Sequence, residues 1–175
     1  MSAVPPLSPM EIAALLEAAM ATLQAELRAL PERLAAWHPA PGEWCVKEVV
    51  GHLIEAERRG FAGRIRILLA SDRPELEAWS QTAVAKARGD CVQPVAVLLD
   101  ELARLRRDSA TLVRGLGEVE LERSGRHPKV GVLRVRDLLQ EWVHHDRNHI
   151  RQMLAAVQAY AWPHMGNAQR FSLPG

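Results

Sequence analysis

The chain has 175 residues, 48% of them hydrophobic, which is enough to bury one continuous core without disulfides or structural metals. Its 22 basic and 21 acidic residues nearly cancel, and the net charge of +1 argues against a dedicated nucleic-acid binder. No apolar run approaches the roughly 18 residues that a membrane-spanning helix needs, so a membrane protein is excluded as well.

Four long amphipathic helices are predicted, because apolar residues recur with a period near 3.6 and nowhere convincingly with a period of two. The first is expected over residues 9–30. Ser8 provides a cap for it, Pro9 suits its first position, and Glu11 completes a capping box. The second helix is expected over residues 44–70.

A polar connection over residues 71–93 separates the second helix from a third over 94–114, and a fourth follows over 135–161. Roughly twenty residues can extend beyond about 60 Å at ~3.3 Å per residue, which is longer than either flanking helix. The connection can therefore cross the whole bundle and leave the second and third helices parallel, unlike a simple up-down-up-down arrangement. We expect one all-α, four-helix bundle domain over residues 1–175.

The cysteines and the start of the chain indicate the cellular compartment. Cys45 and Cys91 are the only cysteines and form no CxxC pair. The first twenty residues lack the basic region of a signal peptide and carry Glu11 and Glu17. We therefore expect a cytoplasmic protein, in whose reducing environment a disulfide is not expected.

Two histidines of the fourth predicted helix suit a metal ion. His149 lies within the apolar stripe of that helix and His145 lies at its edge, four residues earlier. Side chains at this spacing stand about 5–6 Å apart at Cβ, so two imidazoles can converge on one ion. His144 points about 100° away, towards solvent. Such pairs also occur as ordinary residues at the edge of a bundle, and a third ligand is needed to decide.

His52 is the candidate for that third ligand, because it is the only histidine outside the fourth helix that lies well inside a predicted helix. It borders the apolar stripe of the second helix, beside a seam of small residues that includes Gly60 and Gly63. Glycine costs about 1 kcal/mol relative to alanine inside a helix, so these glycines indicate either empty volume near His52 or tight helix packing.

Two carboxylates are candidates for orienting the histidine rings. Asp146 lies near the middle of the apolar stripe, where a carboxylate needs a partner. That partner is either a histidine of another helix or an arginine of the first or third helix in a structural salt bridge. Glu48, one turn before His52, is the weaker candidate, and a solvated position is its alternative.

Four stretches form a recognisable set: PGEWCV at 41–46, VGHL at 50–53, HPKVGVL at 127–133 and HDRNH at 145–149, with Gln152 after it. Together they resemble the DinB/YfiT-like family of metal-binding four-helix bundles, over about residues 10–160. The resemblance implies an up-down-down-up bundle, one divalent ion (zinc or nickel) on His52, His145 and His149, and a homodimer. One departure is Arg134, which stands where relatives often have a Ser or Thr that caps the last helix.

The site and the resemblance together suggest a metal-dependent enzyme acting on a small molecule. Three neutral nitrogens leave coordination positions open, as in catalytic metal sites. Either hydrolysis or transfer of a low-molecular-weight thiol then follows, with Glu55, Glu57 and Asp146 as possible bases. The alternative is a non-catalytic bundle, in which the metal is structural or the surface binds a partner.

Overall fold

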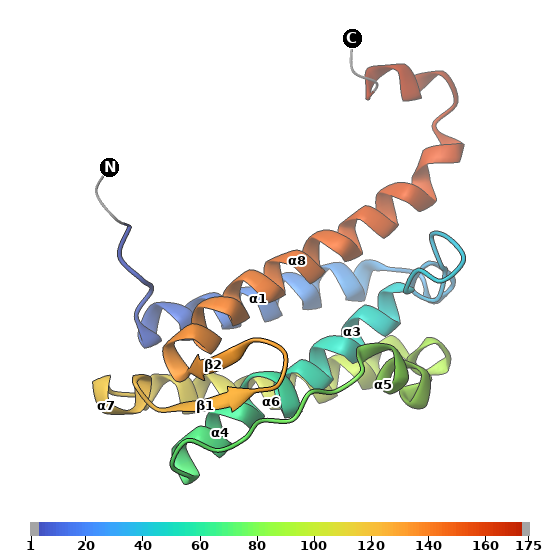
Figure 1. Cartoon of the computed structure of the whole chain (residues 1–175). Helices are drawn as coiled ribbons and strands as arrows, with labels where there is room; N and C mark the ends of the chain where they lie inside the picture. Colours follow the sequence, from blue (N-terminus) through green and yellow to red (C-terminus); the bar gives the residue numbers. More distant parts are fainter. Residues whose placement is uncertain (1–3, 173–175) are drawn as a thin grey trace.

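A computed structural model describes residues 4–172, which are mostly helical (Figure 1). Within these residues no helix combines the length and the hydropathy that crossing a membrane requires. The long helices are α1 (Pro9–Ala29), α3 (Val46–Glu55) continued by α4 (Ala62–Ala70), α6 (Val95–Arg114) and α8 (Val135–Ala161). Short helices lie between and after them: α2 (Glu32–Ala35), α5 (Gln81–Arg88), η2 (Asp90–Val92), α7 (Glu118–Leu121), η3 (Trp162–His164) and η4 (Gly166–Phe171).

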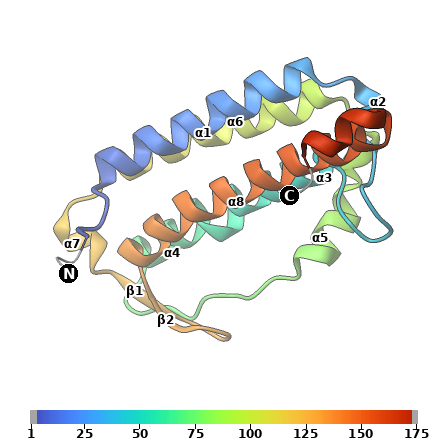
Figure 2. The same cartoon turned by 90° about the horizontal axis from the view of Figure 1, so that it is seen from above.

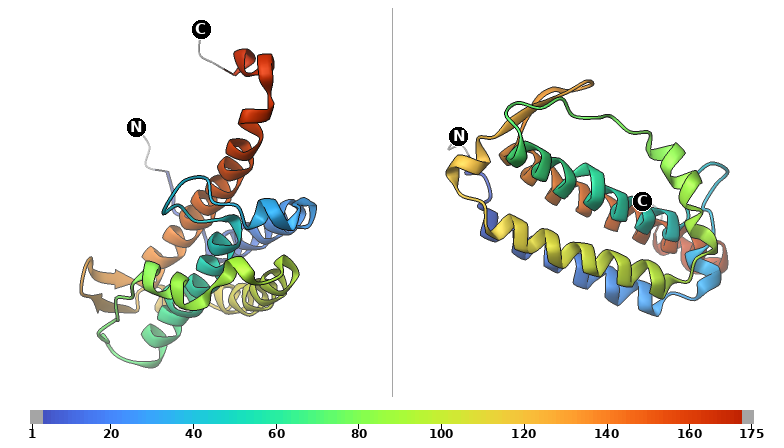
Figure 3. Two further views of the ribbon diagram at one scale, coloured as in Figure 1. Left: turned by 90° about the vertical axis from the view of Figure 1, so that its right-hand side faces the viewer. Right: turned by 90° about the horizontal axis from the view of Figure 1, so that it is seen from below.

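The four long helical segments form an up-down-down-up bundle. α1 and α8 run in one direction, whereas α3–α4 and α6 run in the other (Figure 2). The connection between α4 and α6 travels back along the side of the bundle, as the right-hand view of Figure 3 shows. This crossing connection leaves α3 and α6 parallel and in contact. The fold expected from the connection length and from the family resemblance is confirmed.

The second long helix is interrupted, contrary to the continuous helix predicted over 44–70. A π-helical turn, η1 (Ala56–Gly60), separates α3 from α4, and the N–H of Phe61 donates to the carbonyl of Ala56 over 2.7 Å. Gly63 permits this turn, because a Cβ there would lie 2.0 Å from the carbonyl oxygen of Arg58. Gly63 thus allows close approach of the helix's own backbone. The turn begins four residues after His52, and π-turns often occur at functional sites.

A two-stranded hairpin lies between α7 and α8, where no strand was predicted. β1 (Ser124–His127) pairs antiparallel with β2 (Gly131–Arg134). The crossing connection adds to it, because the N–H of Leu76 donates to the carbonyl of Arg126 over 2.7 Å. Three of the four residues of β2 are exposed, so this strand lacks the alternation of apolar and polar residues that reveals most strands.

The core consists of two apolar clusters with polar residues between them. One cluster contains Leu23 and Met153, and the other contains Leu16 and Trp142. On each helix a short interval separates the members of the two clusters, and polar side chains occupy that interval on α3–η1, α6 and α8. They are His52, Glu55, Glu57, Arg106, Ser109, His145, Asp146 and His149, most of them buried. The candidate site therefore lies near the middle of the bundle.

Cys45 and Cys91 form a disulfide, contrary to the expectation from the sequence. Cys45 directly precedes α3, and Cys91 lies in η2, 46 residues later. The two become neighbours because the crossing connection brings the chain back to the end of the bundle where α3 begins. That proximity depends on tertiary structure, and the spacing of the two cysteines in the sequence does not reveal it.

Candidate metal centre

The structure brings His52, His145 and His149 together. His52 comes from α3, and the other two come from successive turns of α8. The Nε2 atoms of His52 and His145 are 3.0 Å apart, and the His149 ring centroid lies 4.5 Å from each of the other two. One ring nitrogen from each residue lies within 4.8 Å of those from the others. Two helices thus direct three imidazoles to one point.

Burial keeps these rings neutral. Burial, with a smaller contribution from the neighbouring His149, lowers the pKa of His52 to about 4 and that of His145 to about 3. The pKa of His149 is also lowered, mainly by burial. A neutral imidazole retains the lone pair with which histidine binds a metal, so the three rings are ready to act as ligands near neutral pH.

The hydrogen bonds of the rings fit a metal ligand set. Nδ1 of His149 lies 2.9 Å from Oε1 of Gln152, so Nδ1 donates and Nε2 retains the lone pair. His145 Nδ1 is buried and has no hydrogen-bond partner among residues 4–172. Three imidazole nitrogens suit zinc and nickel among the first-row divalent ions. The donor chemistry of the cluster therefore fits the metal that the sequence predicts.

The cluster lies against a cavity of about 580 Å³. Phe61, from the end of the π-turn, and Trp79, from the crossing connection, supply aromatic walls. Trp79 stacks on His52 with ring centroids 5.9 Å apart. The volume is in the range of small-molecule sites, and the aromatic walls are typical of them.

Charged residues line other parts of the same cavity. Arg64 of α4 donates to Nε2 of His127 over 3.1 Å, and Lys129 follows in the hairpin turn. Burial and the charge of Arg64 lower the pKa of His127, which is therefore neutral near pH 7. Glu141 lies on α8 one turn before His145 and also lines the cavity. Sequence reasoning missed Arg64 and Glu141, although the spacing of four between Glu141 and His145 was a usable signal.

The two carboxylates considered as orienting groups bind elsewhere. Asp146 accepts a hydrogen bond from Arg106 of α6, which was one of the two alternatives open from the sequence. Glu48 accepts from the backbone N–H of Cys45 over 2.9 Å and thereby caps α3. Both residues hold the helices that carry the histidines, and neither forms a hydrogen bond with the three rings among the contacts of the described residues.

The other two candidate bases are already engaged in ion pairs. Glu55 pairs with Arg59 at 2.7 Å and with Arg88 at 2.9 Å. Glu57 pairs with Arg106 at 2.7 Å and accepts from Ser109. These carboxylates stabilise the polar layer of the bundle, so Glu141 is the better candidate for proton transfer in the cavity.

Three neutral histidines from two helices of a four-helix bundle converge on one point, and two of them, His52 and His145, line the cavity. This arrangement defines a class of metal-binding helical proteins. The model of the DinB superfamily matches residues 14–153, and the chain belongs to that superfamily. The resemblance inferred from the motifs is confirmed.

Similar proteins carry related names. The chain is 20% identical over 121 residues to "Putative metal-dependent hydrolase OB0782" of Oceanobacillus iheyensis, covering 69% of each chain. It is 22% identical to "Putative metal-dependent hydrolase BcerKBAB4_2443" of Bacillus mycoides over the same shares. The structure of YfiT from Bacillus subtilis, described as "a probable metal-dependent hydrolase with an unusual four-helix bundle topology", matches with a TM-score of 0.81, 18% identity and 93% coverage of each chain. That match shows the shared fold.

Proposed function

We propose that this protein is a metal-dependent hydrolase of a small molecule, with its ion held by one ring nitrogen each of His52, His145 and His149. The observation that carries the proposal is the convergence of three neutral, largely buried imidazoles beside a cavity of about 580 Å³. Zinc or nickel on such a ligand set supplies Lewis acidity, which lowers the pKa of water and stabilises developing negative charge. The names of the relatives support the same reaction class.

The residues of the cavity supply the other parts of the mechanism. The carboxylate of Glu141 accepts a proton from the attacking water, since it makes no hydrogen bond or ion pair among the contacts described for residues 4–172. Arg64 and Lys129 bind an anionic group of the substrate. Trp79 covers one face of His52 and limits the access of bulk water.

A second candidate function is transfer of a low-molecular-weight thiol. Arg64 and Lys129 favour it, because they would hold the carboxylate groups of such a thiol inside the cavity. Here Glu141 would accept the thiol proton, and the sulfur would form a bond to the electrophilic carbon of the second substrate while the leaving group departs.

Metal analysis of the untagged protein tests the ligand set. The wild type should contain about one ion at this centre, whereas His149→Ala should lose it. His144→Ala is the matched control, since His144 lies on the exposed side of the same helix and should leave the metal content unchanged. Equal metal content in His149→Ala and the wild type would rule out the proposed ligands.

Removal of the ion then separates a catalytic metal from a structural one. We expect chelation to abolish hydrolysis of small esters or amides and to change the melting temperature only slightly, with activity restored by zinc or nickel. A large fall in melting temperature with no associated turnover supports the non-catalytic alternative. Turnover only with a thiol cosubstrate supports the transferase.

A further inference from the structure

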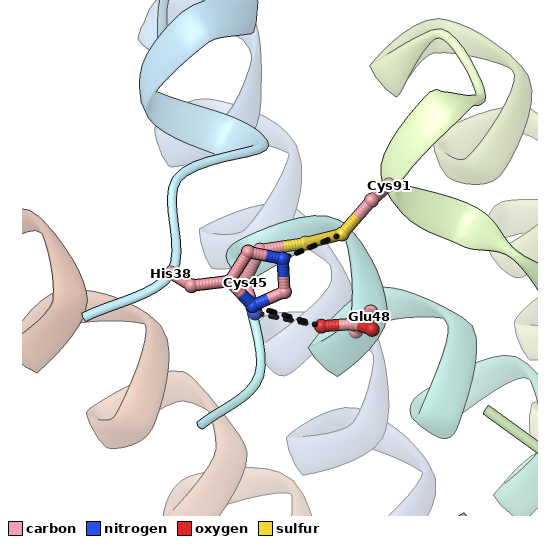
Figure 4. Close-up of side chains that lie close together, drawn as sticks. All are labelled: His38, Cys45, Glu48 and Cys91. Atoms are coloured by element: carbon pink, nitrogen blue, oxygen red, sulfur yellow. Dashed lines mark hydrogen bonds and ion pairs between the residues drawn. A yellow bond between two sulfur atoms is a disulfide. The ribbon is translucent and has the colours of Figure 1, made fainter. Parts of the chain in front are cut away.

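Four potential metal ligands gather about the disulfide, at the start of α3. They are His38 from the connection before α3, Cys45 and Glu48 from the start of α3, and Cys91 from η2 (Figure 4). One ligand atom from each lies within 4.8 Å of those from the other three. The Nε2 of His38 is 3.5 Å from the Sγ of Cys91, and its Nδ1 is 3.6 Å from Oε2 of Glu48.

The His38 ring has the orientation of a metal ligand. Its Nδ1 lies 2.8 Å from the carbonyl oxygen of Glu43, which accepts a hydrogen bond and so fixes the proton on Nδ1. Nε2 therefore directs its lone pair towards the sulfur atoms. A disulfide has no proton to donate to that lone pair, whereas a cation bound to the sulfurs would accept it. A carbonyl behind the ring is the usual support of a metal-binding histidine.

We propose that His38, Cys45, Glu48 and Cys91 form a second divalent-metal site, which is available when the disulfide is reduced and closed when it is formed. Two thiolates, an imidazole and a carboxylate provide the four donors of a tetrahedral zinc site. Cys45 lies at the N-terminus of α3, where the helix dipole favours a thiolate. The His38 side chain is 47% exposed, which gives an ion a route from solvent.

The two states exclude each other for a chemical reason. Two molecules of a low-molecular-weight thiol reduce the disulfide, forming one external disulfide and the two thiols of Cys45 and Cys91. Binding of a divalent ion then releases the two thiol protons. At a zinc–sulfur distance of ~2.3 Å the sulfurs stand about 3.8 Å apart, so they cannot remain bonded to each other. In the reverse direction a low-molecular-weight disulfide exchanges with the two thiolates: the Cys45–Cys91 bond forms, the external S–S bond breaks, its two halves leave as thiols after taking up two protons, and the ion is released.

The disulfide and the metal-bound thiolates would each link the crossing connection to α3. Cys91 lies next to Asp90, whose carboxylate packs so closely on Gly51 that a Cβ there would lie 1.8 Å from its Oδ2. Gly51 directly precedes His52. The second site is therefore expected to stabilise the segment that supports His52, with zinc replacing the disulfide as the link under reducing conditions.

Cobalt absorption tests this proposal independently of the three-histidine centre, because only the second site contains sulfur. The full-length protein, reduced with excess dithiol and freed of it without oxygen, should develop a thiolate-to-cobalt charge-transfer band on titration with Co²⁺. Oxidised protein should lack that band. His149→Ala should retain it, so loss of the proposed hydrolase centre and loss of this site are distinguishable.

Variants test the individual ligands. Cys45→Ser should abolish the charge-transfer band while preserving the helix, since serine is a good N-cap. His38→Ala should weaken cobalt binding in the reduced state by roughly tenfold or more. Absence of the band in reduced wild type, or an unchanged affinity in His38→Ala, would overturn the proposal and leave the cluster as a disulfide only.

Discussion

The Arg106 guanidinium of α6 donates a 2.5 Å hydrogen bond to the carboxylate of Asp146, the residue that follows the candidate ligand His145. Both side chains are about 2% exposed, so this ion pair lies inside the bundle. Arg106 also pairs with Glu57 from the π-turn after α3. One cation thus joins the two helical segments that carry the three candidate ligands.

Removing this cation should destabilise the fold severely. Arg106→Met leaves the carboxylates of Asp146 and Glu57 buried without their counter-ion, and breaking a buried pair typically costs about 3–5 kcal/mol. Arg107→Met is the matched control, because Arg107 is exposed on the same helix and should change the free energy of unfolding by less than about 0.5 kcal/mol. Urea unfolding of both variants measures the difference. Equal losses of unfolding free energy in the two variants would mean that the buried ion pair makes no specific contribution to stability.

Glu57 should make stability fall as the pH rises towards neutrality. Burial raises its pKa from 4.5 to about 7, against the opposing effects of Arg106 and Ser109. The folded state therefore binds this proton more tightly than the unfolded state. The resulting stabilisation is fully present below pH 4.5 and is lost as the pH rises through 7, by up to about 3 kcal/mol.

Glu57→Gln isolates that contribution. The buried histidines of the metal-free protein have lowered pKa values and give the opposite slope, since their stabilising effect is lost as the pH falls below 6.5. The difference in unfolding free energy between Glu57→Gln and the wild type should therefore favour the variant progressively from pH 5 to about pH 8. A difference that is independent of pH would contradict the raised pKa.

Metal affinity should resist acid more than ordinary histidine ligands do. Three imidazoles with a pKa of about 6.5 would lose roughly several hundred-fold in affinity between pH 7 and pH 5.5 through proton competition. The lowered pKa values of His52, His145 and His149 reduce that competition, so we expect a loss of about tenfold or less. Competition titrations with a chromophoric chelator at both pH values measure it, and a several hundred-fold loss would refute the pKa values.

The sequence contained enough information to predict the helices and the meeting of the three histidines. Apolar periodicity defines the long helices, and the spacing of His145 and His149 places them on one face. The length of the crossing connection indicated the parallel helices that the fold contains. The helices, the pairing of His145 with His149 and the parallel arrangement depend on local pattern or chain length, which the sequence displays directly. The addition of His52, from another helix, depended on its place beside an apolar stripe and on the family resemblance.

The features that escaped prediction depend on contacts between distant segments. The π-turn is a single five-residue turn that adds one residue between α3 and α4, and so short an irregularity does not show in the apolar periodicity. The exposed hairpin strand lacks alternation, and the disulfide joins residues 46 positions apart. Arg64 lines the cavity and donates to His127 of the hairpin. Its position among the arginines of a predicted helix does not indicate that contact.

Gly51 should tolerate no side chain. A Cβ at this position would lie 1.8 Å from Oδ2 of Asp90, which Arg88 holds in place by two hydrogen bonds. Gly51→Ala therefore displaces η2 or α3 and should lower the unfolding free energy by about 1–3 kcal/mol. Gly115→Ala is the control, because its Cβ would meet only ordinary contacts of 3.5 Å and longer. Thermal melts compare them, and equal stability would show that Asp90 moves freely.

Glu141 should be needed for turnover and dispensable for the metal. Of the two carboxylates that line the cavity, Asp137 accepts a hydrogen bond from the N–H of Arg134 and so serves the start of α8, where no Ser or Thr stands. Glu141 lies on the same face of α8 as His145 and lines the cavity, so a bound substrate can contact it. Since a positioned base contributes about 10²–10⁴-fold, Glu141→Gln should lower kcat by that factor.

The metal content and melting temperature of Glu141→Gln should equal those of the wild type, and His144→Gln, on the exposed side of the same helix, should retain full activity. If Glu141→Gln hydrolyses substrate at the wild-type rate, proton transfer belongs to another group, and the neutral His127 in the hairpin becomes the next candidate because it lines the same cavity.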